Sequence, residues 1–110
     1  MLCINKNIDK KKILELKNLV EYQDGKVISK TLVQNELVSV TVFSFDKGEE
    51  IPTHASSGDA MVTVLEGKGK FTISGEEYIL EAGQTIIMPK NEPHSVYGED
   101  KFKMLLVVSF

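Results

Sequence analysis

The chain of 110 residues contains two histidines, His54 and His94. A neutral imidazole donates one hydrogen bond and accepts another, and near its ordinary pKa of about 6.5 it can also act as a general base or a metal ligand. An isolated histidine near a strand end is more often a hydrogen-bonded structural side chain. The residue type alone therefore leaves ligand recognition, catalysis and a structural role open.

A metal site needs more than this pair. Stable Zn, Ni, Fe or Mn sites use at least three converging imidazole or carboxylate ligands. Glu50 or Asp59 could be the third ligand, which would give the two-histidine, one-carboxylate set of non-haem iron enzymes. Side chains alternate along a strand, so Asp59 should point outward if Ala60 points inward with Val62 and Val64, unless a bend at Gly58 resets this alternation. We expect no tightly held metal, with a divalent transition metal as the alternative.

Other catalytic arrangements are weaker. Ser56 and Ser57 follow His54 closely, but a nucleophilic serine needs an oriented base and an oxyanion hole, and no strand-to-helix elbow surrounds them. The glycines Gly67 and Gly69 lack the third glycine and the following helix of a dinucleotide-binding turn. The sequence therefore argues against a serine hydrolase and against a dinucleotide site.

The elements that must position these residues are strands. After Asp24 and Gly25, short runs rich in Val, Ile, Thr and Phe alternate with turn residues about every eight to twelve positions. We predict strands over residues 37–45, 61–65, 70–73, 77–80, 84–88, 95–97 and 102–110. A parallel α/β sheet would need long helices between them. The pattern predicts an all-β antiparallel barrel or jelly roll.

The N-terminal segment has a different pattern. Asp9 is predicted to cap a short helix, on which Ile13, Leu16, Leu19 and Val20 share one face. The three lysines at positions 10–12 are interpreted as the solvated side of this helix. We interpret residues 1–110 as one domain, with a helical or extended arm over about 1–24 and a barrel over about 25–110.

Two stretches resemble the two motifs of the cupin family. The first motif runs Gly, five residues, His, one residue, His, three or four residues, Glu, six residues, Gly, and the chain matches it at Gly48, His54 and Gly67. The second runs Gly, five residues, Pro, one residue, Gly, two residues, His, three residues, Asn, and the chain matches it at Gly83, Pro89 and His94. The resemblance implies a cupin jelly roll in which both histidines face one interior pocket.

The chain also departs from these motifs. Ser56 stands at the second histidine, Ala60 at the glutamate, Asn91 at the second glycine and Gly98 at the final asparagine. The resemblance implies a metal held by the three histidines and the glutamate of these motifs, and in this chain two of those four ligands, at positions 56 and 60, are missing.

We expect a pocket lined by five residues: His54, Ser56, Ala60, Met88 and His94. The function that follows is binding of a small molecule. The alternatives are a metal-dependent enzyme of isomerase or dioxygenase type, with His54 and His94 as metal ligands, and a purely structural dimerisation module.

Composition and the last strand bear on partners. The net charge is −3 and no long basic stripe is present, so nucleic acid is not expected as a partner. No membrane span or secretory signal is predicted, and the single cysteine, Cys3, is typical of a cytoplasmic protein. Residues 102–110 are apolar on both faces, which predicts a homodimer, or else a strand lying between two layers of the same chain.

Overall fold

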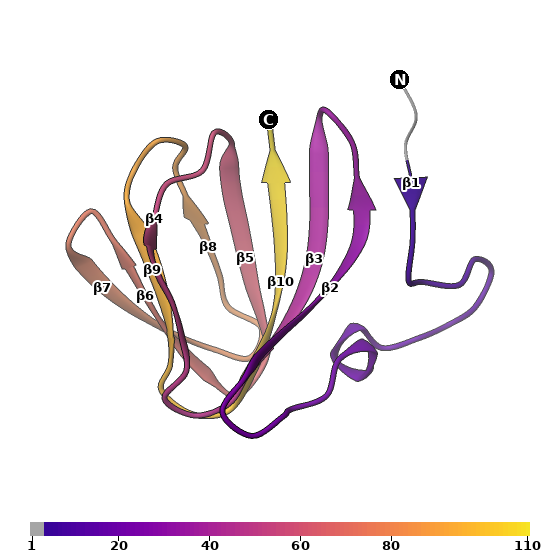
Figure 1. Cartoon of the computed structure of the whole chain (residues 1–110), viewed down its shortest axis with the longest axis horizontal. Coiled ribbons are helices and arrows are strands. Elements are labelled where there is room, and N and C mark those ends of the chain that lie inside the picture. Colours follow the sequence, from indigo (N-terminus) through magenta and orange to yellow (C-terminus); the bar gives the residue numbers. More distant parts are fainter. Residues whose placement is uncertain (1–3) are drawn as a thin grey trace.

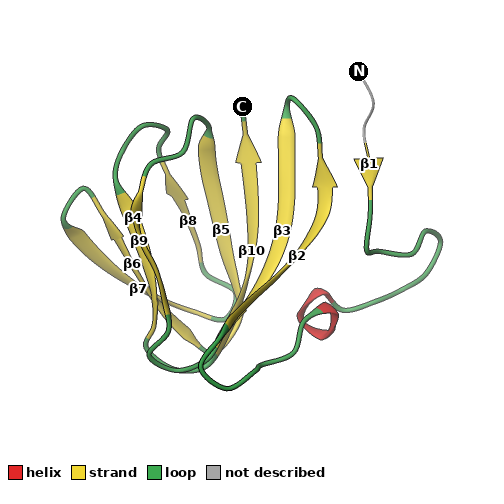
Figure 2. Cartoon of the chain, in the orientation of Figure 1, coloured by secondary structure: helices red, strands yellow, loops and turns green. Residues whose placement is uncertain are grey.

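A computed structural model describes residues 4–110, which form two antiparallel sheets that face each other (Figures 1 and 2). One sheet has the order β1 (Ile4–Asn5), β2 (Val27–Gln34), β3 (Val38–Phe45), β10 (Phe102–Ser109), β5 (Asp59–Glu66), β8 (Thr85–Met88). The other has the order β4 (Glu50–His54), β9 (His94–Gly98), β6 (Lys68–Ile73), β7 (Glu76–Glu81). The predicted all-β antiparallel jelly roll is confirmed.

The seven predicted strands correspond to β3 and to β5 through β10, with ends that differ by at most two residues. Strands β2 and β4 were not predicted individually. β4 is an edge strand, contains Pro52 and is largely exposed, so it shows no apolar alternation. The predicted turn at Ser74 and Gly75 joins β6 to β7, and both residues have positive φ, as a two-residue hairpin turn requires.

An aromatic cluster fills one end of the space between the sheets. Phe45 and Phe102 lie opposite each other on β3 and β10, and their rings stack with centroids 4.5 Å apart. Phe71 on β6 meets Phe102 edge-on at 6.1 Å. Gly69 leaves room for this contact, because a Cβ atom there would lie 2.7 Å from the Phe102 ring. The opposite end of the sandwich is left less filled, and the candidate site lies there.

The predicted N-terminal helix is wrong in extent. The arm contains only a four-residue 3-10 helix, Leu16–Leu19, without a side-chain cap. Lys11 has φ of 58°, a left-handed conformation that an α-helix cannot include, and Ile13 is 101% exposed and joins no apolar face. Leu16, Leu19 and Val20 nevertheless pack on the sheet as one apolar group, so the apolar spacing predicted the contact but not the helix.

This arm covers part of the outer face of the six-stranded sheet. Leu16, Leu19 and Val20 pack with Val42 of β3 and Leu105 of β10. The inner face of β10 carries Met104 and Val108, which belong to the core between the sheets. At Leu105, therefore, the second apolar face of β10 is covered by the same chain. These contacts within one chain do not test the expected homodimer.

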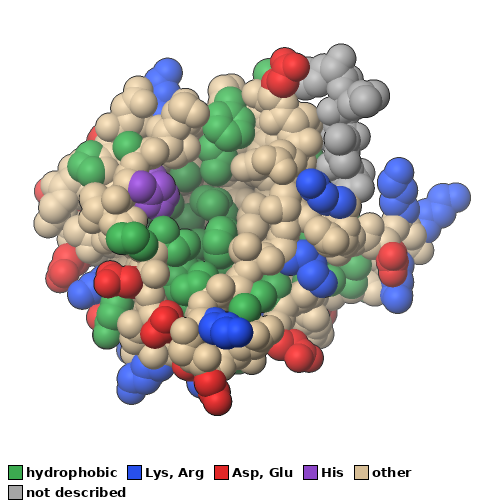
Figure 3. Space-filling view, viewed as in Figure 1, with side chains coloured by type: hydrophobic (Ala, Val, Ile, Leu, Met, Phe, Trp, Pro, Cys, Tyr) green, Lys and Arg blue, Asp and Glu red, His purple; other side chains and the backbone are tan. Residues whose placement is uncertain are grey.

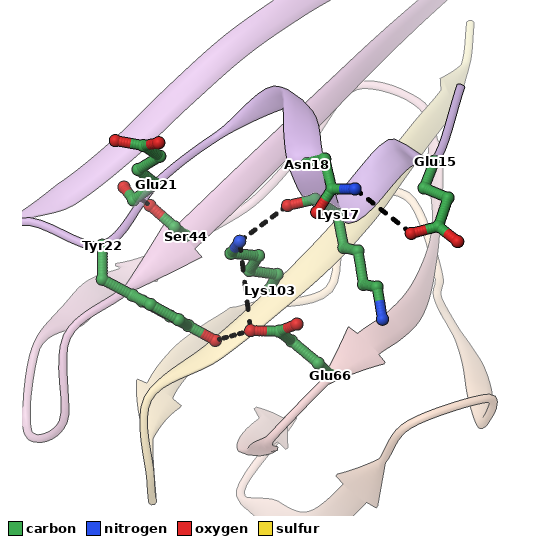
Figure 4. A network of polar contacts seen from close by, with 8 residues as sticks. All are labelled: Glu15, Lys17, Asn18, Glu21, Tyr22, Ser44, Glu66 and Lys103. Carbon is green, nitrogen blue, oxygen red and sulfur yellow. Dashed lines mark hydrogen bonds and ion pairs between the residues drawn. The ribbon is translucent and has the colours of Figure 1, made fainter. Parts of the chain in front are cut away.

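Polar groups hold the arm on the sheet (Figure 4). Because the arm has little regular structure, its carbonyl groups need partners from elsewhere. Lys103, 8% exposed, donates from Nζ to the Lys17 carbonyl at 2.6 Å and lies 3.9 Å from the Glu66 carboxylate. The Ser44 hydroxyl donates to the Glu21 carbonyl at 2.8 Å. The Tyr22 hydroxyl donates to the Glu66 carboxylate at 2.5 Å.

We predict that Lys103→Met loosens the arm. The variant leaves the Lys17 carbonyl without its donor and removes the cation beside Glu66, which should lower the free energy of unfolding by about 1–2 kcal/mol. Lys17→Ala is the matched control, because it removes an exposed side chain and keeps the carbonyl. Urea denaturation measures both variants, and equal losses would contradict the assigned role of Lys103.

Candidate functional site

Two strand ends bring the histidines together. His54 is the last residue of β4 and His94 the first of β9, and the two are directly paired in the antiparallel register. Their imidazole rings meet edge to face, with centroids 4.4 Å apart and planes at 68°. The predicted pairing of these side chains therefore arises from backbone pairing between two strands that are distant in sequence.

Both rings are oriented by the same local contact. His54 Nδ1 lies 3.0 Å from the carbonyl oxygen of Pro52, and His94 Nδ1 lies 3.2 Å from that of Glu92. A carbonyl oxygen only accepts, so each Nδ1 must carry the proton and donate. In the neutral ring the Nε2 atom then has a free lone pair at the end farthest from the backbone. The site thus presents two imidazole acceptors.

The surroundings of His94 disfavour its protonated form. His94 is buried, at 3% exposure, whereas His54 is exposed. Burial lowers the pKa of His94 below its usual value of 6.5, and positive charge on the neighbouring His54 lowers it further. The hydrogen bond to the Glu92 carbonyl opposes this shift in part. The neutral form of His94, which can accept a hydrogen bond at Nε2, is therefore favoured relative to that of a solvent-exposed histidine.

A cavity of about 380 Å³ lies between the sheets beside the histidines. In the space-filling view, a hollow with hydrophobic walls has histidine at its rim (Figure 3). Its apolar wall is formed by side chains from both sheets: Phe43, Ile51, Ala60, Met88, Val96, Met104, Leu106 and Val108. Ser56 and Ser57 add hydroxyl groups, and none of the described lining residues is Asp, Glu, Lys or Arg. This is an apolar pocket with polar groups at one end.

The structure places all five residues of the expected pocket on the cavity wall, His54, Ser56, Ala60, Met88 and His94. Ala60 and Met88 are paired across β5 and β8, and both are buried. The backbone N–H of Asn91 donates to the carbonyl oxygen of Ser56 at 2.8 Å. Asn91 has φ of 64°, so it adopts the left-handed conformation for which the second motif has glycine.

The two carboxylates considered as third metal ligands lie elsewhere. Asp59 is exposed and accepts from the Lys90 amide at 2.9 Å, while its neighbour Ala60 faces inward, as strand alternation predicts. Glu50 is exposed at the start of β4, opposite Tyr97. Neither lines the cavity, and the residues from 4 to 110 include no group of three His, Cys, Asp or Glu placed to hold an ion. Cys3 lies outside the described residues.

The donor set therefore does not fit a metal held by three or four protein ligands, because two imidazoles alone bind a divalent ion weakly. Sequence analysis did not identify most of the apolar wall. Strand alternation within residues 102–110 puts Met104, Leu106 and Val108 on one face, and the structure turns that face toward the cavity. Ile51 and Val96 come from short strands whose alternation gives no clear signal.

Comparisons with known proteins agree with this architecture. The model of the cupin domain matches residues 41–109. The chain belongs to the cupin family. It is similar to the conserved protein SPY1581 of unknown function from Streptococcus pyogenes, with 47% identity over 96% of this chain and 92% of that one, and a TM-score of 0.92. A cupin superfamily protein from Desulfitobacterium hafniense is 27% identical over 97% and 98% of the two chains, also with a TM-score of 0.92.

More distant cupin structures show the fold alone. A salicylate 1,2-dioxygenase from Pseudoaminobacter salicylatoxidans is 21% identical over 76% of this chain and 25% of its own, with a TM-score of 0.71. None of the curated proteins compared with the chain matches it. No helix within residues 4–110 has the length and apolar character needed to cross a membrane.

We predict that His54→Asn raises the pKa of His94 toward 6.5, because it removes a neighbouring positive charge and leaves the burial of His94 unchanged. NMR titration of the His94 ring protons measures this pKa in the unaltered chain and in the variant. Ser57→Ala is the control, since it changes the cavity wall without removing a charge. An unchanged His94 pKa in His54→Asn would show that the two rings do not interact electrostatically.

The sign of the pH effect follows from the same shift. A His94 pKa lower in the folded than in the unfolded chain means that the unfolded chain binds the proton more tightly. The contribution of His94 to stability is thus complete above about pH 6.5 and decreases as the pH falls below it. Urea titrations measure the free energy of unfolding at pH 7.5 and at about pH 5. The decrease between the two pH values should be smaller for His94→Phe than for the unaltered chain.

Proposed function

We propose that this cupin binds a small, neutral organic molecule between its sheets, without a tightly held metal. The observation that carries the proposal is the pair of adjacent imidazoles, each with Nδ1 donating to a carbonyl, at one end of an apolar cavity. A volume of about 380 Å³ is within the range of small-molecule pockets. The wall supplies apolar contact and the histidines supply acceptors.

The lining favours a particular ligand chemistry. Phe43, Met104 and Leu106 give the cavity an apolar wall, which favours binding of a ligand with a large hydrocarbon part. Two neutral Nε2 acceptors favour a ligand with a hydroxyl or amine hydrogen to donate. A carboxylate would bring a negative charge into a cavity whose described lining contains no Lys or Arg, which is costly in an apolar pocket. Phenols and similar alcohols therefore fit better than organic acids.

A thermal-shift screen of phenolics, sugars and organic acids tests this proposal. We expect phenol-type ligands to stabilise the protein at pH 7.5 and the matched pair benzoate and toluene to do so less. His54→Phe keeps an aromatic ring but removes an acceptor, so the dissociation constant of the phenol should rise about tenfold. Ile79→Ala, on the exposed β7 strand away from the cavity, is the control. Equal binding of toluene and phenol, or no binding by any class, would contradict the proposal.

The rival function is a metal-dependent cupin enzyme of isomerase or dioxygenase type. The observation in its favour is that both rings are held through Nδ1 by carbonyl oxygens, the second contact that metal-binding histidines commonly make. Elemental analysis of protein from metal-replete growth separates the two. About one equivalent of metal that is lost in His54→Ala but kept in Ser57→Ala would favour the metal-dependent enzyme and contradict metal-free small-molecule binding.

A further inference from the structure

We propose that a groove between β7 and β8 binds a small organic cation, a primary ammonium with an apolar body, separately from the cavity beside the histidines. Within residues 4–110, β7 ends the four-stranded sheet and β8 ends the six-stranded sheet, so each leaves one edge unpaired. Both strands lie away from the N-terminal arm (Figure 1). The groove that they border has a volume of about 470 Å³.

Part of the groove lining is apolar and belongs to the core. Ile73 of β6 is buried, and Ile86 of β8 packs against the same core cluster. Both line the groove, together with Pro89 from the loop that follows β8. A ligand that enters the groove can therefore bury hydrocarbon against side chains that the core already holds in place.

Polar side chains of β7 face this apolar lining. Side chains alternate along a strand, so Glu76 and Tyr78 share the face of β7 that carries the buried Leu80. That face is turned toward the other sheet, where apolar residues are the rule. Both Glu76 and Tyr78 line the groove. A carboxylate and a phenol ring are thus directed into the opening between the sheets.

A second carboxylate comes from the loop between β8 and β9. Glu92 is half-buried and lines the same groove. Ser74 Oγ donates to the Glu92 carboxylate at 2.8 Å, and the Tyr78 hydroxyl donates to the Glu76 carboxylate at 2.8 Å. The hydrogen bond to Glu76 raises the pKa of Tyr78, and the charge of Glu92 raises it further. The two negative charges therefore act on the same point of the groove.

No cation of the described chain neutralises these two charges. None of the described residues that line the groove is Lys, Arg or His. Within residues 4–110, neither Glu76 nor Glu92 forms an ion pair. On the outer face of the same strand, by contrast, Glu77 lies 3.4 Å from Lys70. The groove is therefore complementary to a cation supplied from outside the chain.

These features favour an ammonium ligand over a metal ion. An ammonium group donates up to three hydrogen bonds, and such bonds to carboxylates are stronger than those between neutral groups. The Tyr78 ring can add a cation–π contact. A divalent ion needs more oxygen ligands than two carboxylates supply, and residues 4–110 contain no group of three His, Cys, Asp or Glu placed to hold one. An amine with an apolar body uses both the charges and the apolar lining.

NMR titration of the full chain with hexylammonium tests this proposal through the isoleucine methyl resonances. We expect the methyl groups of Ile73 and Ile86 to shift. The dissociation constant of hexylammonium at this site should be about tenfold lower than that of hexanol, which has the same hydrocarbon chain without the charge. Raising the salt concentration to about 0.5 M should reduce this difference, because salt screens the two carboxylates.

Three variants of equal shape test the role of the charges. Glu76→Gln and Glu92→Gln each remove one carboxylate, and each should raise the dissociation constant of hexylammonium about threefold or more while leaving that of hexanol unchanged. The matched control is Glu77→Gln, which removes the same charge from the outer face of β7 and should leave hexylammonium binding unchanged.

Several outcomes would overturn the proposal. Equal binding of hexylammonium and hexanol would do so, as would a loss of affinity in Glu77→Gln equal to that in Glu92→Gln. Shifts of Ile51, on the wall of the histidine cavity, in place of Ile73 and Ile86 would assign the ligand to the other site. Carboxylates that only keep the open strand edges from pairing with other chains would give no shifts up to about 20 mM ligand. The same shifts with calcium ion alone, at lower concentration, would make the groove a metal site instead.

Discussion

The architecture depends on β10, which lies at the centre of the six-stranded sheet and is the last strand of the described chain. It pairs along its whole length with β3 on one side and along most of it with β5 on the other. Its inner face supplies Met104, Leu106 and Val108 to the cavity wall, and its outer face supplies Lys103 and Leu105 to the arm. One strand thus fixes both the pocket and the cover of the sheet's outer face.

Local patterns predicted the strands well, because alternation and turn residues act within a few positions of each other. They predicted the arm poorly. The apolar spacing of Leu16, Leu19 and Val20 suits a helical face, but it serves equally for a segment that lies on a sheet, and tertiary contact decides between them. Lysine at position 103 had no local signal at all, since its partners, the Lys17 carbonyl and Glu66, are far away in sequence.

The candidate site was predictable where motif spacing fixed positions, as for His54 and His94, and where a departure has a conformational meaning. Asn91 is an example, because asparagine tolerates the left-handed backbone that glycine occupies in the motif. The ring orientations were not predictable, since they depend on the carbonyls of Pro52 and Glu92. The placing of Asp59 outside the cavity followed from alternation, whereas that of Glu50 needed the β4–β9 register.

The central place of β10 also constrains how the protein is made. A ribosome releases β3 and β5 well before residues 102–109, and those two strands do not pair with each other. Until β10 emerges, each has an open hydrogen-bonding edge and a row of Val or Phe side chains, features that promote association between nascent chains. The large sheet is therefore completed only after residues 102–109 have been made, when the two long-range pairings of β10 can form together.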